Sequence, residues 1–224
     1  IFGPPGLGKT TLSQVIANTS PVTVASDGRL ELNNLSETIG RLTGTGSVTM
    51  SGTGTLAVGD ATNFSFGGII SGSGNFDKVS SGVMTLTAAQ TFTGFTRVSE
   101  GTLVLGSPNG TQTIKGAVTI GDANGAAASA ILKTNGNYRI ASNTCNVIIR
   151  SDGQLDIGDF LEDVGTINVD RGQVAMLNAG RLRMFGDLSM SAGTISGGSL
   201  WLGGNVLVNS TPSAGAMISS TYFE

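Results

Sequence analysis

The sequence predicts an all-β protein built from short, repeated strands. Glycine accounts for 35 of the 224 residues, more than twice the share of about 7% that is usual in proteins, and glycine is the residue that tight turns favour. Hydrophobic residues still make up 39% of the chain, enough to bury a core. A motif also recurs along the chain, in which a small or acidic residue and a glycine precede alternating apolar and polar residues. Such pieces are too short to be stable alone and become stable by stacking on copies of themselves.

The recurring motif predicts where the strands lie. Alternation places Leu30 and Leu32 on one face of a strand, and the glycine before each strand is expected to adopt a positive φ at a turn. Asn33 and Asn34 follow at an expected corner, where asparagine tolerates left-handed backbone and can bond to its neighbours in a stack. The expected strands are residues 22–24, 30–32, 48–50, 56–58, 84–86, 92–95, 97–98, 103–105, 118–120, 147–149, 155–157, 167–169, 174–176, 182–184, 188–190, 200–202 and 206–208.

The spacing of these strands limits the possible architectures. They follow one another too closely for the crossover of about a dozen residues that a βαβ unit needs. An antiparallel sandwich also uses closely spaced strands, so the periodicity alone leaves both a stacked solenoid and a sandwich open.

Composition excludes several classes of function. The net charge of −3 and the absence of a basic stripe argue against nucleic-acid binding. The chain has no histidine, which removes Ser-His-Asp and Cys-His catalysis and every histidine-based metal site. Cys145 is the only cysteine, so no internal disulfide can form. The chain has no run of about 18 apolar residues, so no transmembrane helix is predicted. Because the chain starts at Ile1 inside a motif, we expect a fragment or mature form.

The stretch from residue 74 to residue 106 carries a family resemblance. It reads GNFDKVSSGVMTLTAAQTFTGFTRVSEGTLVLG and resembles the autotransporter-associated β-strand repeat of bacterial secreted passenger proteins. The resemblance covers residues 21–106 well and continues to residue 210 as rhythm and composition. It implies a right-handed parallel β-helix that works outside the cell, with Phe92 and Phe95 packed at a corner. The resemblance therefore favours the solenoid over the sandwich.

The first residues carry a different motif. Residues 1–12 read IFGPPGLGKTTL and satisfy the phosphate-binding pattern G-x-x-x-x-G-K-[ST]. The string resembles the Walker A segment of AAA+ ATPases, in the version found in the Holliday-junction branch-migration motor. The resemblance implies that Gly3, Gly8, Lys9 and Thr10 would hold the phosphates and Mg²⁺ of a nucleotide.

The rest of a nucleotide-binding domain is missing from the sequence. Only two residues precede the motif, and no apolar strand ends in the Asp that organises Mg²⁺ and water. ATP binding is therefore an alternative, and no cofactor is expected. Residues 1–20 are interpreted as a foreign leader or as a loop and helix cap that lays Leu12, Val15 and Ile16 on the first coil. Residues 21–210 form the predicted β-helix, and residues 211–224 form a C-terminal tail.

Charged residues offer two further hypotheses. The first is a Ca²⁺ site, although no known calcium-binding repeat is present, so a solvated outer face and no metal site are expected. The second is a β-helix enzyme that acts on polysaccharide, which needs carboxylates, or carboxylates with Arg or Lys, on one exposed face. Asp156 with Asp170, and Arg171 with Arg181 and Arg183, are the candidates for that enzyme. The acidic cluster considered for Ca²⁺ is Asp152, Asp156, Asp159, Glu162, Asp163 and Asp170.

The favoured function is structural. Trp201 is expected to point away from the core, because Leu200 and Leu202 flank it, and it is the candidate for surface interaction. Broad strand faces rich in threonine suit flat contacts better than a concave catalytic pocket. Together with the resemblance to the passenger repeat, these features predict a non-enzymatic, adhesive β-helical passenger segment of an exported protein at the bacterial cell surface. Its expected partners are a host surface, matrix, other cells or further copies of itself.

Overall fold

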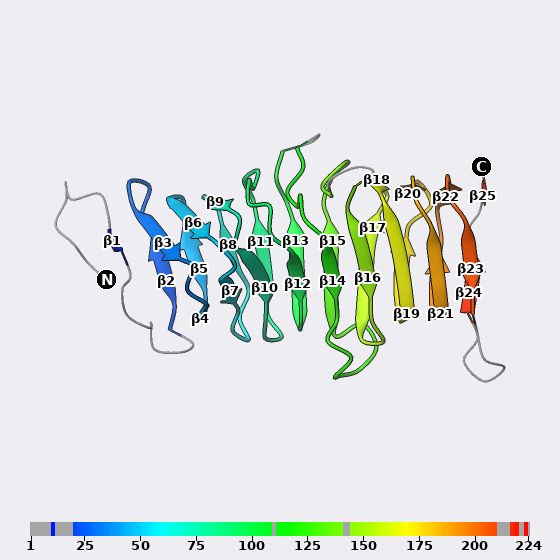
Figure 1. Ribbon diagram of the computed structural model, residues 1–224, viewed down its shortest axis with the longest axis horizontal. Coiled ribbons are helices and arrows are strands. Elements are labelled where there is room, and N and C mark those ends of the chain that lie inside the picture. The colour runs from blue at the N-terminus through cyan, green and yellow to red at the C-terminus, as the bar shows by residue number, and fades with distance from the viewer. Residues whose placement is uncertain are drawn as a thin grey trace.

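The computed structural model describes residues 10–11, 20–108, 111–140, 144–209, 216–219 and 222–223. Its strands stack as a β-solenoid of about 9 turns, and these residues contain no helix. Figure 1 shows a rod whose strands lie across its long axis. All pairings between described strands are parallel. The predicted parallel β-helix is therefore confirmed over the sandwich, while its handedness stays a prediction.

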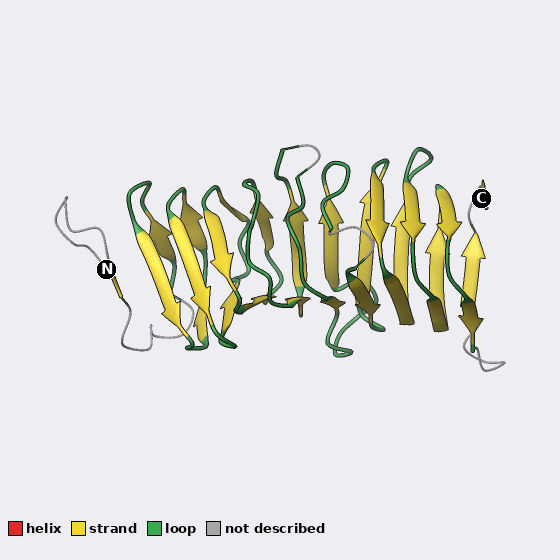
Figure 2. Ribbon diagram, turned by 45° about the horizontal axis from the view of Figure 1, so that its top comes forward, coloured by secondary structure: helices red, strands yellow, loops and turns green. Residues whose placement is uncertain are grey.

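Each turn of the solenoid runs over three faces, which lie at different depths in the tilted view of Figure 2. Face 1 contains two separate groups of strands, and between them the described residues contain one isolated bridge, between Ile114 and Ile140. The first group is β1 (Thr10–Thr11), β3 (Arg29–Asn33), β6 (Ser47–Ser51) and β9 (Ile69–Gly72). The second group is β18 (Leu161–Val164), β20 (Arg181–Met184), β22 (Ser199–Leu202) and β25 (Tyr222–Phe223).

Faces 2 and 3 belong to one continuous sheet, because β19 (Thr166–Met176) and β21 (Leu188–Ser196) bend around the corner between them with shifts in register. Their first parts complete face 2 and their second parts complete face 3. Face 2 otherwise contains β4 (Glu37–Ile39), β7 (Thr55–Val58), β10 (Asn75–Lys78), β12 (Thr96–Val98), β14 (Val118–Ile120), β16 (Asn146–Ile149) and β23 (Val206–Val208). Face 3 otherwise contains β2 (Val22–Val24), β5 (Leu42–Gly44), β8 (Phe64–Phe66), β11 (Val83–Leu86), β13 (Gly101–Leu105), β15 (Ala130–Thr134), β17 (Gly153–Gly158) and β24 (Ala216–Ser219).

The core consists of inward side chains that stack from coil to coil. Alternation along many of the strands buries every second residue, as Leu30 and Leu32 show in β3. One such column on face 2 contains Val58, Lys78 and Val98, which are register partners in β7, β10 and β12. The lysine stem replaces a valine there, and its Nζ donates to the carbonyls of Val79, Ser80 and Glu100 at 2.8, 2.6 and 3.1 Å. The core thus admits a buried charge where a turn supplies oxygen acceptors.

The recurring glycines are required mainly by close packing between coils. Gly101 has the expected positive φ of 72°, but Gly28, Gly153, Gly172 and Gly180 do not, so the predicted conformation is wrong at these four positions. A Cβ at Gly153 would lie 2.2 Å from the carbonyl oxygen of Ile120 in the previous coil. Only a residue without a side chain lets successive corners approach this closely.

Strand pairing also reaches both ends of the described chain. The backbone of Thr10 pairs with Leu30, as a two-residue strand, and so differs from the start of a helix that a phosphate-binding loop places at this position. Gly3, Gly8, Lys9 and the predicted helical cap lie outside the described residues. Within the predicted tail, β24 and β25 pair in parallel with β21 and β22, so coil stacking continues beyond residue 210.

Candidate interaction surfaces

Trp201 lies on the outer side of face 1 as part of an aromatic pair. Its neighbour Leu200 is buried, while Trp201 is half-buried in the next position of β22. The indole packs against the ring of Phe185, with centroids 5.5 Å apart and planes tilted by 57°. A Cβ at Gly203 would lie 2.7 Å from the indole, so the ring lies directly over this glycine. Phe185 is 45% exposed, and the pair therefore forms a fixed, partly apolar platform.

Arg183 places a charged network beside this platform. It is the register partner of Trp201 across β20 and β22. Its Nε and Nη2 donate to Oδ1 and Oδ2 of Asp163 at 2.7 and 2.6 Å, and Nη2 reaches the hydroxyl of Tyr138 at 3.5 Å. The hydrogen bonds to Asp163 raise the pKa of Arg183. We call Tyr138, Asp163, Arg183, Phe185 and Trp201 the Trp201 patch.

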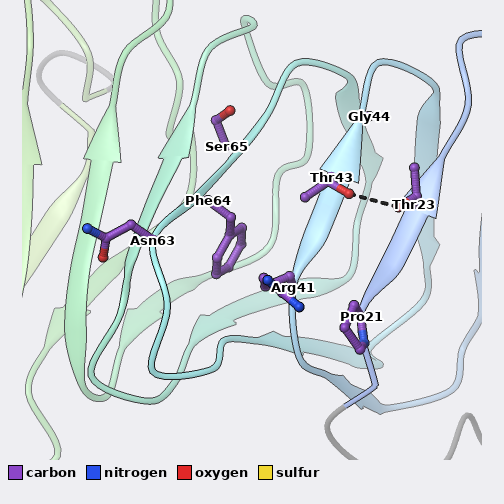
Figure 3. A pocket seen from close by; sticks show the side chains of 8 residues that line it. All are labelled: Pro21, Thr23, Arg41, Thr43, Gly44, Asn63, Phe64 and Ser65. Atoms are coloured by element: carbon purple, nitrogen blue, oxygen red, sulfur yellow. Dashed lines mark hydrogen bonds between the residues drawn. The ribbon is translucent and has the colours of Figure 1, made fainter.

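A shallow groove of about 570 Å³ crosses face 3 near the first coils (Figure 3). Hydroxyl groups line its edge, and the Oγ1 atoms of Thr23 and Thr43 are 2.9 Å apart in neighbouring strands. The half-buried ring of Phe64 provides its apolar surface. Arg41 at its margin forms an ion pair with Asp60, with Nε and Oδ2 3.1 Å apart. The complete lining is Pro21, Thr23, Arg41, Thr43, Gly44, Asn63, Phe64 and Ser65. This groove can accept a flat polar ligand, but it does not enclose one.

Only part of the acidic cluster lies on the solvated face that we expected, since Asp159 is exposed and Asp156 and Asp170 are half-buried. Asp152 and Glu162 are fully buried, and Asp163 is 5% exposed and ion-paired to Arg183. Asp152 accepts the backbone N–H groups of Asp122 and Ala123 at a corner, at 3.2 and 2.8 Å. The buried carboxylates thus bind groups of other coils, which is why the local sequence did not reveal them. Among the described residues, no group of three or more His, Cys, Asp or Glu side chains is placed to hold a metal ion.

The residues considered for polysaccharide chemistry are distributed over different faces. Asp156 lies in β17 on face 3 and is paired with Lys133 at 2.6 Å. Asp170 lies near the corner of β19, where Arg171 and Ser191 hydrogen-bond to its carboxylate and lower its pKa. Arg181 and Arg183 are on β20 of face 1. The structure therefore does not assemble these side chains into one site.

Alternation along one strand identified Trp201 but not the residues around it. Tyr138, Phe185 and Arg183 are far from Trp201 along the chain, and the coil repeat brings them together. A signal was present, because the motifs at residues 179–184 and the strand at residues 200–202 are successive copies of one repeat. Aligning those copies would have placed Arg183 beside Trp201. Phe95, also expected at a packed corner, is 41% exposed, whereas Phe92 is buried as expected.

Comparison of the chain with known proteins finds no relative. No family model matches the chain, and neither curated proteins nor solved structures give a match. The described part of the chain contains no helix that is long and apolar enough to cross a membrane.

Proposed function

We propose that this chain is a structural, adhesive β-helical segment of an exported bacterial surface protein of the autotransporter type. The observation that carries the proposal is the unbroken stack of coils on faces 2 and 3, which supports the Trp201 patch on the outer side of face 1. Such a rod holds its contact surfaces at fixed distances along its axis. The resemblance of residues 74–106 to the passenger repeat supports the assignment to this type of protein.

The contacts of the solenoid suit folding outside the cell. Each strand pairs with strands one coil away, as Thr85 does with Ser65 and Val104. A coil can therefore add to the stack as soon as it emerges from a secretion channel, without waiting for distant parts of the chain. The single cysteine, Cys145, is buried and free, so this folding requires no disulfide partner.

Adhesion is assigned to the Trp201 patch. Tryptophan, tyrosine and arginine are the side chains that contribute most often to binding energy at protein interfaces. Here the indole is supported by Phe185 and lies over Gly203, and Arg183 is oriented by Asp163. Little conformational freedom is therefore lost when a partner covers these side chains.

The export proposal is tested by display on living cells. The chain is fused between a secretion signal and an autotransporter translocation unit in a Gram-negative bacterium, and intact cells are treated with a protease. We expect the chain at the cell surface as a compact core that resists limited digestion. Retention inside the envelope, or complete digestion at the surface, would contradict the proposal.

The adhesion proposal is tested on the same cells with two single substitutions. We expect Trp201→Ala to reduce attachment to fixed epithelial cells and to a basement-membrane extract. Leu177→Ala is the matched control, because Leu177 is 59% exposed and lies outside the patch. Equal attachment of the parent and the Trp201→Ala variant would exclude the patch as the adhesive surface.

A further inference from the structure

A second groove, of about 310 Å³, lies on face 2 across three successive coils. Its residues come from the start of β12, from β14 and the turn after it, and from the end of β16. They are Phe95, Arg97, Thr119, Gly121, Asp122 and Arg150. Arg97 and Thr119 are register partners on neighbouring strands, so their outward side chains are adjacent. The groove volume lies at the lower end of the range of about 300–1,000 Å³ that small-molecule sites occupy.

A loop that other coils lack builds one wall of the groove. Residues 121–129 connect β14 to β15, whereas residues 99–100 and 150–152 make the same corner in the neighbouring coils. The buried carboxylate of Asp152 holds the start of this loop through the N–H groups of Asp122 and Ala123. A Cβ at Gly121 would lie 2.3 Å from Oδ1 of Asp152, so a glycine is needed for this contact. The wall is therefore anchored to the core of the solenoid.

Two guanidinium groups give the groove its positive charge. Arg97 is held by Asp77, whose Oδ2 accepts from Nε and Nη2 at 2.8 and 2.6 Å. Ser99 donates to Oδ1 of Asp77 at 2.8 Å and fixes that carboxylate. The Arg97 side chain remains 44% exposed, and its remaining N–H groups are free to meet a ligand. Arg150 is exposed, and its side chain forms no hydrogen bond or ion pair with another described residue.

The other side chains in the groove favour a sugar over a simple anion. The ring of Phe95 is 41% exposed, and a sugar ring can lay its C–H groups against such a surface. Thr119 and Asp122 supply hydrogen-bond acceptors, which the hydroxyl groups of a sugar need and a phosphate does not. The carboxylate of Asp122 also disfavours a ligand with two negative charges. A ring that carries one carboxylate and several hydroxyl groups matches all of these features.

We propose that this groove binds the uronic acid units of an acidic polysaccharide. The sugar carboxylate pairs with the guanidinium groups of Arg150 and Arg97, its hydroxyl groups donate to Asp122 and Thr119, and its ring rests on Phe95. The inference goes beyond the proposed function, because the groove lies on face 2, apart from the Trp201 patch on face 1, and would bind whether or not the chain is exported.

The test is calorimetric titration of the full chain with oligogalacturonate. Arg150→Gln removes one guanidinium without disturbing an internal ion pair, and Arg181→Gln makes the same change in charge on an exposed arginine of face 1. We expect Arg150→Gln to weaken binding about tenfold or more, since a charge-assisted hydrogen bond is lost, and Arg181→Gln to leave the affinity unchanged. Circular dichroism and the denaturation midpoint confirm that both variants are folded.

Two further ligands identify which part of the sugar is recognised. The methyl-esterified oligosaccharide lacks the carboxylate charge and is expected to bind at least tenfold more weakly. Inorganic phosphate is expected not to compete at concentrations that saturate the oligogalacturonate. The proposal is overturned if the parent chain binds no oligogalacturonate, if the ester binds equally well, if phosphate competes as strongly, or if the two arginine variants behave alike.

Discussion

Glu162 accepts the backbone N–H of Arg139 from the preceding coil, with Oε2 2.9 Å from the nitrogen. The same oxygen accepts the N–H of Ile140 at 3.1 Å. The carboxylate thus replaces a backbone acceptor where face 1 lacks a regular strand. Burial raises the pKa of Glu162 to about 8, although the two backbone hydrogen bonds oppose this change. A proton therefore binds Glu162 more tightly in the folded chain than in the unfolded chain.

We expect this proton to make stability depend on pH. Between the ordinary glutamate pKa of 4.5, which applies to the unfolded chain, and the folded value of about 8, the folded state holds more protons. The stabilisation is therefore complete below pH 4.5 and is lost as the pH rises to about 8, with a slope on the order of 1 kcal/mol per pH unit. Urea denaturation of the parent and of Glu162→Gln across this range measures the effect. An unchanged slope in the variant would refute it.

Lys78 is expected to have the opposite effect at higher pH. Burial lowers its pKa from 10.5 to about 8, so the unfolded state holds more protons between these values. The contribution of Lys78 to stability therefore rises as the pH rises from about 8 to 10.5, and the two groups together place a minimum of stability near pH 8. The same denaturation series with Lys78→Met should lack the alkaline rise. Lys133→Met, at a lysine whose side chain is 48% exposed, should keep it.

The two aromatic residues of the repeat should differ sharply in their contribution to stability. Phe92 is fully buried and packs against Phe76, with centroids 6.0 Å apart. Phe92→Ala is expected to lower the free energy of unfolding by about 3–5 kcal/mol, because it leaves a cavity. Phe95→Ala removes an exposed ring and should cost about 0.5 kcal/mol or less. Similar losses in chemical denaturation would show that the packing assignment is wrong.

A methyl group at a corner glycine should separate two coils. A Cβ at Gly172 would lie 2.4 Å from the carbonyl oxygen of Arg150, so Gly172→Ala is expected to destabilise the chain by about 1–3 kcal/mol. At Gly67 the nearest atom would be the Thr45 methyl at 3.2 Å, and Gly67→Ala should be nearly neutral. Thermal melting of both variants compares the two positions, and equal melting temperatures would contradict the close approach at Gly172.

Cys145 should report on global unfolding. The thiol is 1% exposed, and burial raises its pKa to about 12. Because the thiolate is the reactive species, we expect no reaction with a thiol reagent in native buffer and rapid reaction in denaturant. The rate of labelling across a denaturant series should follow the loss of the β signal in circular dichroism. Rapid labelling of the native chain would place Cys145 at the surface.

The sequence predicted many of the strands and missed others, including β8 with its alternating Phe64 and Phe66 and strands whose core positions are polar. Each expected strand, such as residues 30–32, lies within a strand of the structure, except residues 92–95, which form no strand between β11 and β12. β18 was missed because Glu162 occupies a core position there, and β15 because the apolar Ile131 points outward and the polar Thr134 occupies a core position. A buried carboxylate is predictable only when its partners are known, and these belong to another coil.

The candidate sites were less predictable than the strands for the same reason. Trp201 was identified from alternation along one strand, but Arg183 and Phe185 join it only through the pairing of β20 with β22. The face 2 groove draws Phe95, Thr119 and Arg150 from three coils of unequal length. The unequal lengths hide the register from the sequence, so only the three-dimensional stack shows which residues meet.

The interruption in face 1 has a mechanical consequence. Between the strand groups that end at β9 and begin at β18, the described residues of this face contain no regular strand and one isolated bridge, between Ile114 and Ile140. Faces 2 and 3 carry the connection through the middle of the rod (Figure 1). If the two ends are pulled apart, the strain concentrates on two sides of a three-sided column. We therefore expect the rod to bend and to rupture first at its middle coils, leaving two stacks that each remain folded.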